Sequence, residues 1–274
     1  MNKYKVHIPL IFSVVVLLAG FGSAPAQSVG ISPASVDAKV KRGSSYTQDF
    51  TITNSSGTRL RFRCSTEDLW YDEQGKRFSG RSGTLPHSAS LWTQFSSSEI
   101  IVEPRGSAVV KAIITIPKDA SGSFYTVPVF DGLPDAPADT KIGTAATATI
   151  GIRFRGLMMF TTDEGSEYNV EITGGRITPP TASTELQISS DLRNRGTAHA
   201  KVRGAYAILN AAGKLVGRGT IEEKTYLPTQ HKNIDGLWSG ELPPGIYTAV
   251  ATLSYNRVGL EPSSLVYEIP FTVK

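Results

Sequence analysis

The stretch LWTQFSSSEIIVEPRGSAVVKAIITIPKDASGSFYTVPVF, residues 91–130, contains three apolar, β-branched runs separated by two turn signals. Residues 108–116 alternate with a period of two, which is the pattern of a strand with one buried face. Residues 104–107 and 117–122 supply the turns, because proline fixes φ and glycine permits conformations that other residues avoid. Strands at this spacing predict an antiparallel sandwich rather than an α/β domain. On the buried face of residues 108–116 we expect Val110, Ala112 and Ile114.

The order of elements in this stretch also carries a family resemblance. Trp92 precedes a short polar segment, and then follow Ile100-x-Val102, Pro104-x-Gly106, an apolar strand, Ile116-Pro117 and Gly122-x-Phe124-Tyr125. This order resembles the first domain of the periplasmic pilus-assembly chaperones. The resemblance implies an immunoglobulin-like domain and covers roughly the first half of the chain that follows the leader.

The chain opens with the pattern of a secretory signal peptide. Lys3 and Lys5 form a basic region, residues 8–18 are largely apolar, and Ala24-Pro25-Ala26 is a small-x-small cleavage motif. The alternative is an uncleaved anchor, but the apolar run is shorter than the about 20 residues that cross a bilayer. We therefore expect residues 1–26 to be removed and the mature protein to begin at Gln27. Its expected location is the periplasm, with the cell surface as the alternative, and no stable membrane span is expected.

Charge and cysteine content narrow the possible functions. The 274-residue chain has 28 Lys and Arg against 24 Asp and Glu, and removal of residues 1–26 leaves 26 basic residues. This balance does not favour a nucleic acid as partner. One cysteine, Cys64, excludes an intrachain disulfide. It shares a strand face with Leu60 and Phe62, so we interpret it as a buried apolar side chain rather than a reactive thiol.

The chain length predicts two domains, residues 27–160 and residues 161–274. The strand pattern and the resemblance together make both of them immunoglobulin-like β-sandwiches, arranged in tandem. In the first domain we expect a strand broken at Pro33, and a helical turn at residues 89–95 with Leu91 and Phe95 facing the core. Residues 157–160 are expected at the domain interface and residues 161–165 in an exposed linker. In the second domain we expect a Tyr247 corner and strands at residues 168–173, 185–192, 198–209, 215–225, 232–242, 247–255 and 265–273.

Three arginines, Arg59, Arg61 and Arg63, alternate with apolar residues and share one face of a predicted strand. They could form an anion site, but such a row is more often a solvated sheet face.

The last strand of the first domain is expected at residues 146–154, with Ala146, Ala148, Ile150, Ile152 and Phe154 on one face. In the chaperone family the equivalent edge strand lends alternating apolar side chains to an unfinished pilin subunit. The resemblance therefore makes Ile150, Ile152 and Phe154 candidate subunit-binding residues. The alternative is that these side chains face the core of their own domain, and the pattern does not separate the two.

The resemblance also implies an anchor for the terminal carboxylate of the pilin, formed by two basic residues between the domains. Arg153-Phe154-Arg155 matches the basic-apolar-basic pattern, so Arg155, with Arg153 beside it, is the candidate anchor. The second basic residue should lie near the start of the first strand. This chain has Ser32-Pro33-Ala34-Ser35 there and departs from the family pattern.

No catalytic arrangement is recognisable in the sequence. His87, His199 and His231 lie in separate segments without neighbours at metal-ligand spacing. We found neither a nucleophile elbow nor a phosphate-binding glycine loop. We therefore expect no enzymatic activity, no cofactor and no metal.

The sequence thus predicts a periplasmic, chaperone-like protein that binds and caps pilus or surface-fibre subunits by strand donation. An outer-membrane usher is a further candidate partner in fimbrium biogenesis. The alternative is a structural or adhesive cell-surface protein that only shares the sandwich fold. A weaker alternative is a carbohydrate-binding module with Trp70, Tyr71 or Trp238 as its platform.

Overall fold

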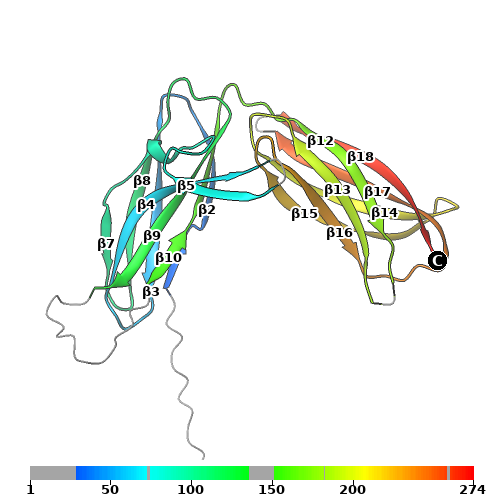
Figure 1. Cartoon of the computed structure of the whole chain (residues 1–274), viewed down its shortest axis with the longest axis horizontal. Helices are drawn as coiled ribbons and strands as arrows, with labels where there is room; N and C mark the ends of the chain where they lie inside the picture. Colours follow the sequence, from blue (N-terminus) through cyan, green and yellow to red (C-terminus); the bar gives the residue numbers. More distant parts are fainter. Residues whose placement is uncertain (1–28, 73–74, 136–150, 182, 258–259) are drawn as a thin grey trace, which may run out of the picture.

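The computed structural model describes residues 29–72, 75–135, 151–181, 183–257 and 260–274. Over these ranges the chain forms β-strands and one 3₁₀ turn, arranged as two elongated lobes set at an angle (Figure 1). The expected all-β fold of two tandem sandwiches is confirmed. The leader and its cleavage motif lie outside the described residues. Within the described ranges, no helix has the length and apolarity that crossing a membrane requires.

The first sandwich consists of two sheets. One sheet has the order β1-β3-β8-β6, and the other has β2-β11-β9-β4-β5, with β10 beside β9 and β7 beside β4. The expected break at Pro33 is confirmed, because it sends β1 and β2 into different sheets. The elements are β1 (Val29–Ser32), β2 (Ser35–Val40), β3 (Ser45–Asn54), β4 (Leu60–Tyr71), β5 (Arg77–Arg81), η1 (Ser90–Trp92), β6 (Thr93–Phe95), β7 (Glu99–Val102), β8 (Gly106–Thr115), β9 (Ser123–Pro134), β10 (Ile152–Arg155) and β11 (Leu157–Thr162).

The core of the first sandwich follows the period-two pattern of the sequence. Val110, Ala112 and Ile114 are buried between the sheets as expected. They belong to one cluster with Phe130. Cys64 is buried in the same cluster, and burial raises the pKa of its thiol to about 11. A thiol that stays protonated at neutral pH is a poor nucleophile, which agrees with its interpretation as an apolar side chain.

The turn at residues 89–95 differs from the expectation. Leu91 is 71% exposed, so its predicted place in the core is wrong. Phe95 packs against the core as expected, and Trp92 takes the place of Leu91, with its ring centroid 4.5 Å from that of Phe124. Only residues 90–92 are helical, and they form a 3₁₀ turn. Because β6 begins at Thr93 and pairs with β8, the sheet rather than a helical period decides which side chains face inward.

The turn before β8 also differs from the expectation that its glycine adopts the unusual backbone conformation. The left-handed residue is Arg105, with φ of 55°, and not the glycine that follows it. Gly106 is needed for a different reason, because a Cβ there would lie 3.2 Å from the carbonyl oxygen of Glu103.

The predicted arginine row is exposed, with Arg61 and Arg63 on β4 and Arg59 just before it. Two of its members, Arg59 and Arg61, are paired with carboxylates. Arg59 lies 3.1 Å from Glu103, and Arg61 lies 3.0 Å from Glu99 and 2.9 Å from Asp135. These contacts support the interpretation as a solvated sheet face, because the carboxylates already occupy the positions that an external anion would take.

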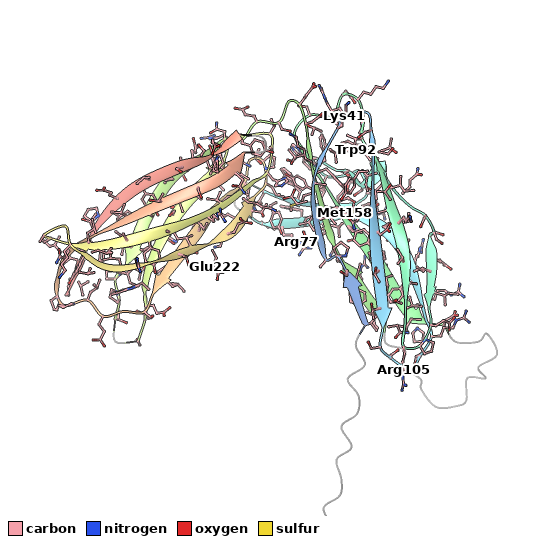
Figure 2. The ribbon with its side chains drawn as sticks, turned by 180° about the vertical axis from the view of Figure 1, so that it is seen from behind. Lys41, Arg77, Trp92, Arg105, Met158 and Glu222 are labelled. Carbon is pink, nitrogen blue, oxygen red and sulfur yellow. The ribbon has the colours of Figure 1, made fainter. Side chains whose placement is uncertain are left out.

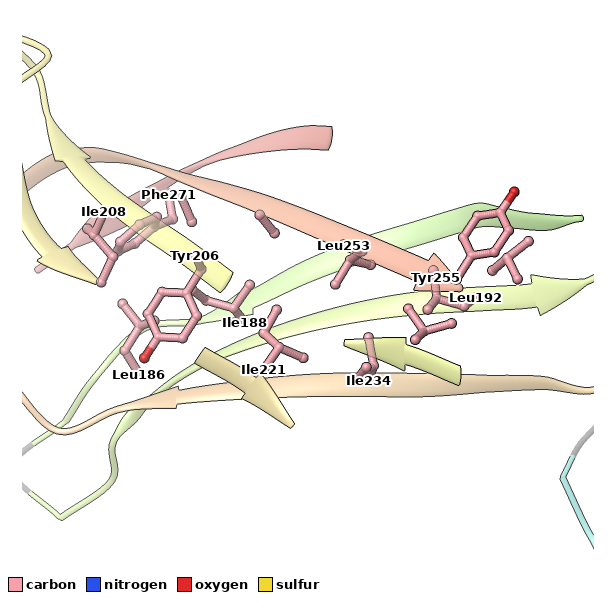
Figure 3. Close-up of a cluster of buried hydrophobic side chains, with 14 of the residues drawn as sticks. Leu186, Ile188, Leu192, Tyr206, Ile208, Ile221, Ile234, Leu253, Tyr255 and Phe271 are labelled. Atoms are coloured by element: carbon pink, nitrogen blue, oxygen red, sulfur yellow. The ribbon is translucent and has the colours of Figure 1, made fainter. Parts of the chain in front are cut away.

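The second sandwich contains all seven expected strands, with ends that differ by a few residues. One sheet has the order β12-β13-β16 and the other β15-β14-β17-β18. Figure 3 shows how Ile188, Leu192 and Leu253 fill the space between the sheets. The Tyr247 corner is confirmed, since its hydroxyl donates to the carbonyl oxygen of Pro243 at 2.7 Å. The strands are β12 (Val170–Thr178), β13 (Leu186–Asn194), β14 (Ala200–Asn210), β15 (Leu215–Tyr226), β16 (His231–Trp238), β17 (Gly245–Arg257) and β18 (Leu260–Val273).

The exposed linker between the two sandwiches begins two residues later than expected. Thr161 and Thr162 are the last residues of β11 and are buried, whereas residues 161–165 were expected to be an exposed linker. The Thr162 hydroxyl accepts from the N–H of Gly122 at 3.0 Å, which satisfies a polar group inside the domain. Exposure begins at Asp163.

Each domain contains a buried asparagine as the last residue of an equivalent strand, Asn54 in β3 and Asn194 in β13. The side-chain amide of Asn54 donates to the carbonyl four residues ahead at 2.8 Å, and its oxygen accepts from the N–H two residues ahead at 3.0 Å. Asn194 makes the same two bonds at 2.8 and 2.9 Å. One side chain thus holds the turn closed in both domains.

We expect Asn54→Ala to lower the free energy of unfolding by about 2–4 kcal/mol. The amide also donates to the carbonyls of Val102 and Glu103, and both of these hydrogen bonds are lost with it. The control is Asn210→Ala, whose oxygen accepts from two amides at an exposed turn and should cost about 1 kcal/mol or less. Urea unfolding of both variants measures the difference, and equal losses would contradict the role of Asn54.

Candidate functional site

β10 and β11 form one line along β9. Ile152 pairs with Gly132 and Met158 pairs with Thr126 in the same antiparallel register, and only Gly156 separates the two strands. On its other side β11 pairs in parallel with β2. Among the described residues β10 pairs with β9 alone, because β1 has passed to the other sheet. As far as the described residues extend, β10 is therefore an open edge.

The main chain of β10 presents hydrogen-bonding groups to this open side. The N–H of Gly156 donates to Pro128 of β9 at 2.9 Å, and the N–H of Leu157 donates in the opposite direction, to Ala34, at 3.0 Å. Successive residues of a strand alternate in this way. The main-chain groups of Arg153 and Arg155 therefore point to the same side as those of Leu157, at a level that lies before the start of β2 at Ser35. Unpaired groups of this kind are a template for another strand.

The candidate subunit-binding side chains lie at the margin of the core. Ile152 and Phe154 are partly buried and pack against the core of the first domain. The Phe154 ring stacks on that of Phe62, with centroids 6.3 Å apart. Each side chain keeps part of its surface exposed at the open edge. Ile150, with Ala146 and Ala148, lies outside the described residues.

The two arginines of β10 face outward and share one carboxylate. The Arg155 guanidinium lies 2.5 Å from Oε2 of Glu67, and the Arg153 guanidinium pairs with Oε1 of the same side chain. Arg155 also donates to the hydroxyl of Ser79 at 3.1 Å, and Arg153 lies 3.4 Å from Asp131. The candidate anchor is thus built to hold a carboxylate, and in this chain Glu67 supplies it.

A pocket of about 300 Å³ lies between the domains beside β11. Ser35 lines it, from the segment in which the resemblance implies a basic residue. Its apolar side continues into a contact between Leu227 of the second domain and Tyr125 and Met159 of the first. The first domain contributes Ser35, Leu69, Tyr71, Leu157 and Met159, and the second contributes Lys224, Thr225, Leu227, Gln230 and Lys232. Figure 2 shows Arg77, on the β4–β5 hairpin, between the two lobes.

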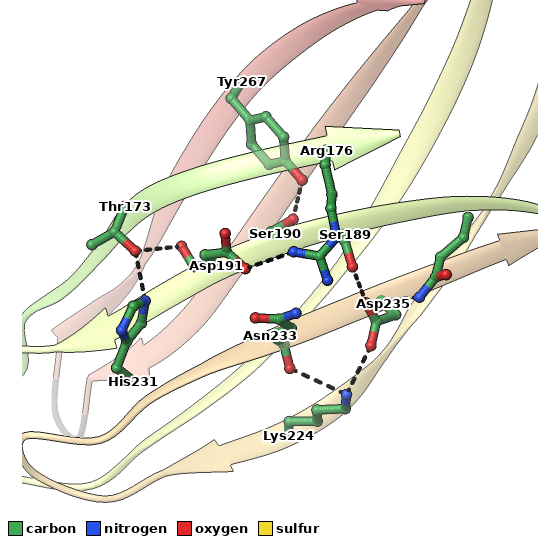
Figure 4. A network of polar contacts seen from close by, with 11 residues as sticks. Thr173, Arg176, Ser189, Ser190, Asp191, Lys224, His231, Asn233, Asp235 and Tyr267 are labelled. Atoms are coloured by element: carbon green, nitrogen blue, oxygen red, sulfur yellow. Dashed lines mark hydrogen bonds and ion pairs between the residues drawn. The ribbon is translucent and has the colours of Figure 1, made fainter. Parts of the chain in front are cut away.

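The two lysines of this pocket were missed by the sequence analysis. Lys224 lies 3.4 Å from Asp235, as Figure 4 shows. Lys232 donates to the carbonyl of Thr225 and lies 4.8 Å from the ring centroid of Tyr226, but no carboxylate of the described residues pairs with it. Burial, with a smaller contribution from the charge of Lys224, lowers the pKa of Lys232 to about 8. No local pattern could have revealed this site, because it forms only when the second domain faces β11.

A polar cluster that is buried at Ser123 and His199 and partly exposed at Asp37 and Lys201 joins one domain to the other. The backbone N–H of His199 donates to the Ser123 hydroxyl at 2.9 Å, and its Nε2 lies 3.2 Å from Asp37. Lys201 reaches the other oxygen of Asp37 at 2.6 Å. Burial opposes ionisation of Asp37, but the bonds and charges from His199 and Lys201 outweigh it and lower its pKa to about 2. Ser123 is fully buried, so this serine, histidine and aspartate offer no accessible nucleophile.

The three candidate platform rings all have packing partners within the chain. Tyr71 lines the interdomain pocket, and Trp70 packs against the contact of Tyr125, Met159 and Leu227 and stacks on His87, with centroids 4.9 Å apart. Trp238 packs against the core of the second domain. In the part of the chain that the structure describes, no group of His, Cys, Asp and Glu could hold a metal ion.

No protein-family model and no curated protein matches this sequence. A chain from a chaperone–tip adhesin complex of CFA/I fimbriae biogenesis is 15% identical with a TM-score of 0.47, covering 88% of this chain and 98% of that one. The class 5 fimbriae chaperone CfaA is 16% identical, with a TM-score of 0.45 and the same coverage. The Pseudomonas aeruginosa CupB2 chaperone is 11% identical, with a TM-score of 0.41, covering 86% and 97%. At these identities the similarity to the fimbrial chaperones is one of fold alone.

The Asp37 cluster predicts an acid-sensitive domain contact. A folded-state pKa below the unfolded value of about 3.9 means that the stabilisation is complete above that pH and is lost as the pH falls through about 2. We expect Asp37→Asn to lower the free energy of unfolding near neutral pH by about 2 kcal/mol and to flatten its decline below about pH 4. Urea unfolding across this range tests it, with the exposed Asp49→Asn as control. Equal effects of both variants would contradict the role of Asp37.

Proposed function

We propose that this protein is a chaperone that lends β10 to an incomplete, secreted β-sandwich subunit of a pilus or surface fibre. The open edge of β10 carries the proposal. This strand pairs with β9 alone among the described residues, and the main-chain groups of Arg153 and Arg155 point away from β9. A segment with an unpaired edge and alternating side chains is the arrangement used in strand addition.

The two faces of β10 take different parts in this function. The main chain at Arg153 and Arg155 bonds to an edge strand of the subunit, each bond contributing about 0.5–1.5 kcal/mol net. Ile152 and Phe154 extend from the margin of the core into the gap of the subunit, where a missing strand leaves apolar side chains uncovered. Their partial burial in the free chain keeps the donor strand ordered before the subunit arrives.

The terminal carboxylate of the subunit binds in the cleft beside β11. Arg155 supplies one cation from the first domain. It is two residues from Leu157, which lines the interdomain pocket, and lies about 7 Å along the strand from it. Lys232 supplies the second cation from the facing wall, which belongs to the second domain. It takes the part of the basic residue that Ser35 of the first domain replaces. With a pKa of about 8, Lys232 remains largely protonated near neutral pH.

Such a chaperone works in the periplasm and delivers its subunit to an outer-membrane usher. The alternative function is a structural or adhesive surface protein, in which the edge of β10 has no partner to complete. The two functions differ in what happens when the open side of β10 is blocked.

We expect Arg153→Pro to abolish capture of subunits while the thermal melt of the free chain changes little. Proline removes the N–H of residue 153, which points away from β9, and proline is tolerated at such edge positions. The matched control is Arg153→Ala, which removes the same side chain and keeps the N–H. The measurement is co-purification with each secreted subunit encoded beside the gene, co-expressed with this chain.

Capture that survives Arg153→Pro in a folded variant would contradict strand donation through β10. Equal loss in Arg153→Pro and Arg153→Ala would also contradict it, since the guanidinium rather than the main chain would then account for binding.

A further inference from the structure

Glu67 occupies both arginines of β10 in the free chain. It lies on β4, opposite Val127 of β9, and the arginines extend across β9 to reach it. The side chain of Glu67 is 25% exposed, and those of Arg155 and Arg153 are 32% and 51% exposed. Each oxygen of the carboxylate takes one guanidinium, which is how a carboxylate from another chain would bind the same pair.

Glu67 also has a place to move to. A polar groove of about 730 Å³ lies between β4 and β5, and Glu67 lines it together with Arg81. The two residues are direct neighbours across the β4–β5 pair, where Cβ atoms lie about 4.5–5.5 Å apart. No carboxylate of the described residues pairs with Arg81. The groove thus offers Glu67 a second cation and room to reach it.

We infer that Glu67 is an internal competitor that holds Arg153 and Arg155 until an incoming carboxylate displaces it toward Arg81. This inference rests on the proposed function for its physiological ligand, the terminal carboxylate of a subunit. In the exchange Glu67 leaves two guanidinium groups, which the incoming carboxylate takes over, and gains one new partner in Arg81. Glu67 thereby weakens the binding of any free carboxylate, which must displace a partner that is already in place. A subunit bound along β10 overcomes this competition, because it presents its carboxylate at high effective concentration.

Acetate is the probe for a test that requires no subunit. Acetate is titrated into the full chain, and the side-chain N–H signals of Arg153 and Arg155 are followed by nitrogen-15 NMR. We expect Glu67→Gln to bind acetate roughly three to ten times more tightly than the unchanged chain, as removal of an ion pair of this exposure implies. Arg81→Ala should weaken acetate binding, because Glu67 loses its alternative partner.

The matched control is Glu99→Gln, which removes a carboxylate from Arg61 on the same sheet and should leave the signals of Arg153 and Arg155 unchanged. Acetate affinity that is equal in Glu67→Gln and the unchanged chain overturns the inference, and so does an Arg81→Ala variant that binds acetate as well as the unchanged chain. A thermal melt of each variant confirms that it is folded.

The result separates this inference from the proposed function. Tighter acetate binding in Glu67→Gln, combined with subunit capture that survives Arg153→Pro, would support the competitor and contradict strand donation. Unchanged acetate binding, combined with loss of capture in Arg153→Pro, would contradict the competitor and leave strand donation supported.

Discussion

The division of the N-terminal strand at Pro33 is the constraint on which the rest of the first domain depends. Main-chain groups at a sheet edge must be paired, covered or left open. β1 completes one sheet beside β3, and β2 completes the other beside β11. A single segment cannot cover both sheets along their whole length. Because β1 pairs with β3 in the first sheet, it does not cover β10 in the second sheet. The same segment that covers the edge of one sheet thus leaves the edge of the other open.

The candidate site belongs to neither domain alone. The first domain supplies the open strand and Arg155, and the second supplies Lys224 and Lys232 on the facing wall. Their relative position is set by the Asp37–His199 cluster and by the apolar contact of Leu227 with Met159. The hydrogen bonds and ion pairs of the polar cluster fix the relative orientation of the domains, and the apolar contact buries surface between them. Both lie next to the pocket. The distance between the two walls of the candidate site is therefore set by how firmly these contacts hold the domains together.

Sequence patterns predicted the features that depend on local periodicity. The strand faces of Val110 and Ile114, the buried Cys64 and the Tyr247 corner all follow from spacing along one strand or turn. Leu91 was misplaced because a three-residue 3₁₀ turn gives way to a strand before a helical face can form. Glu67 and Lys232 were not recognised, because their partners lie on other strands or in the other domain.

The junction between the domains shows a second limit of sequence patterns. Thr161 and Thr162 look like linker residues in composition, yet they are buried. Their hydroxyls take hydrogen bonds that only the folded domain offers, from Gly122 and Ser123 among others. Polarity alone predicts exposure, and a polar side chain with a partner in the core reverses that prediction.

The single register of β10 and β11 along β9 has a mechanical consequence. A force applied to β10 along its axis acts parallel to the strands, so the ladder of hydrogen bonds to β9 resists it in shear. All bonds from Ile152 to Thr161 then share the load at once, instead of opening one after another. The same line ends at the junction of the two domains. Tension on the open edge is thus transmitted through β11 to the second domain.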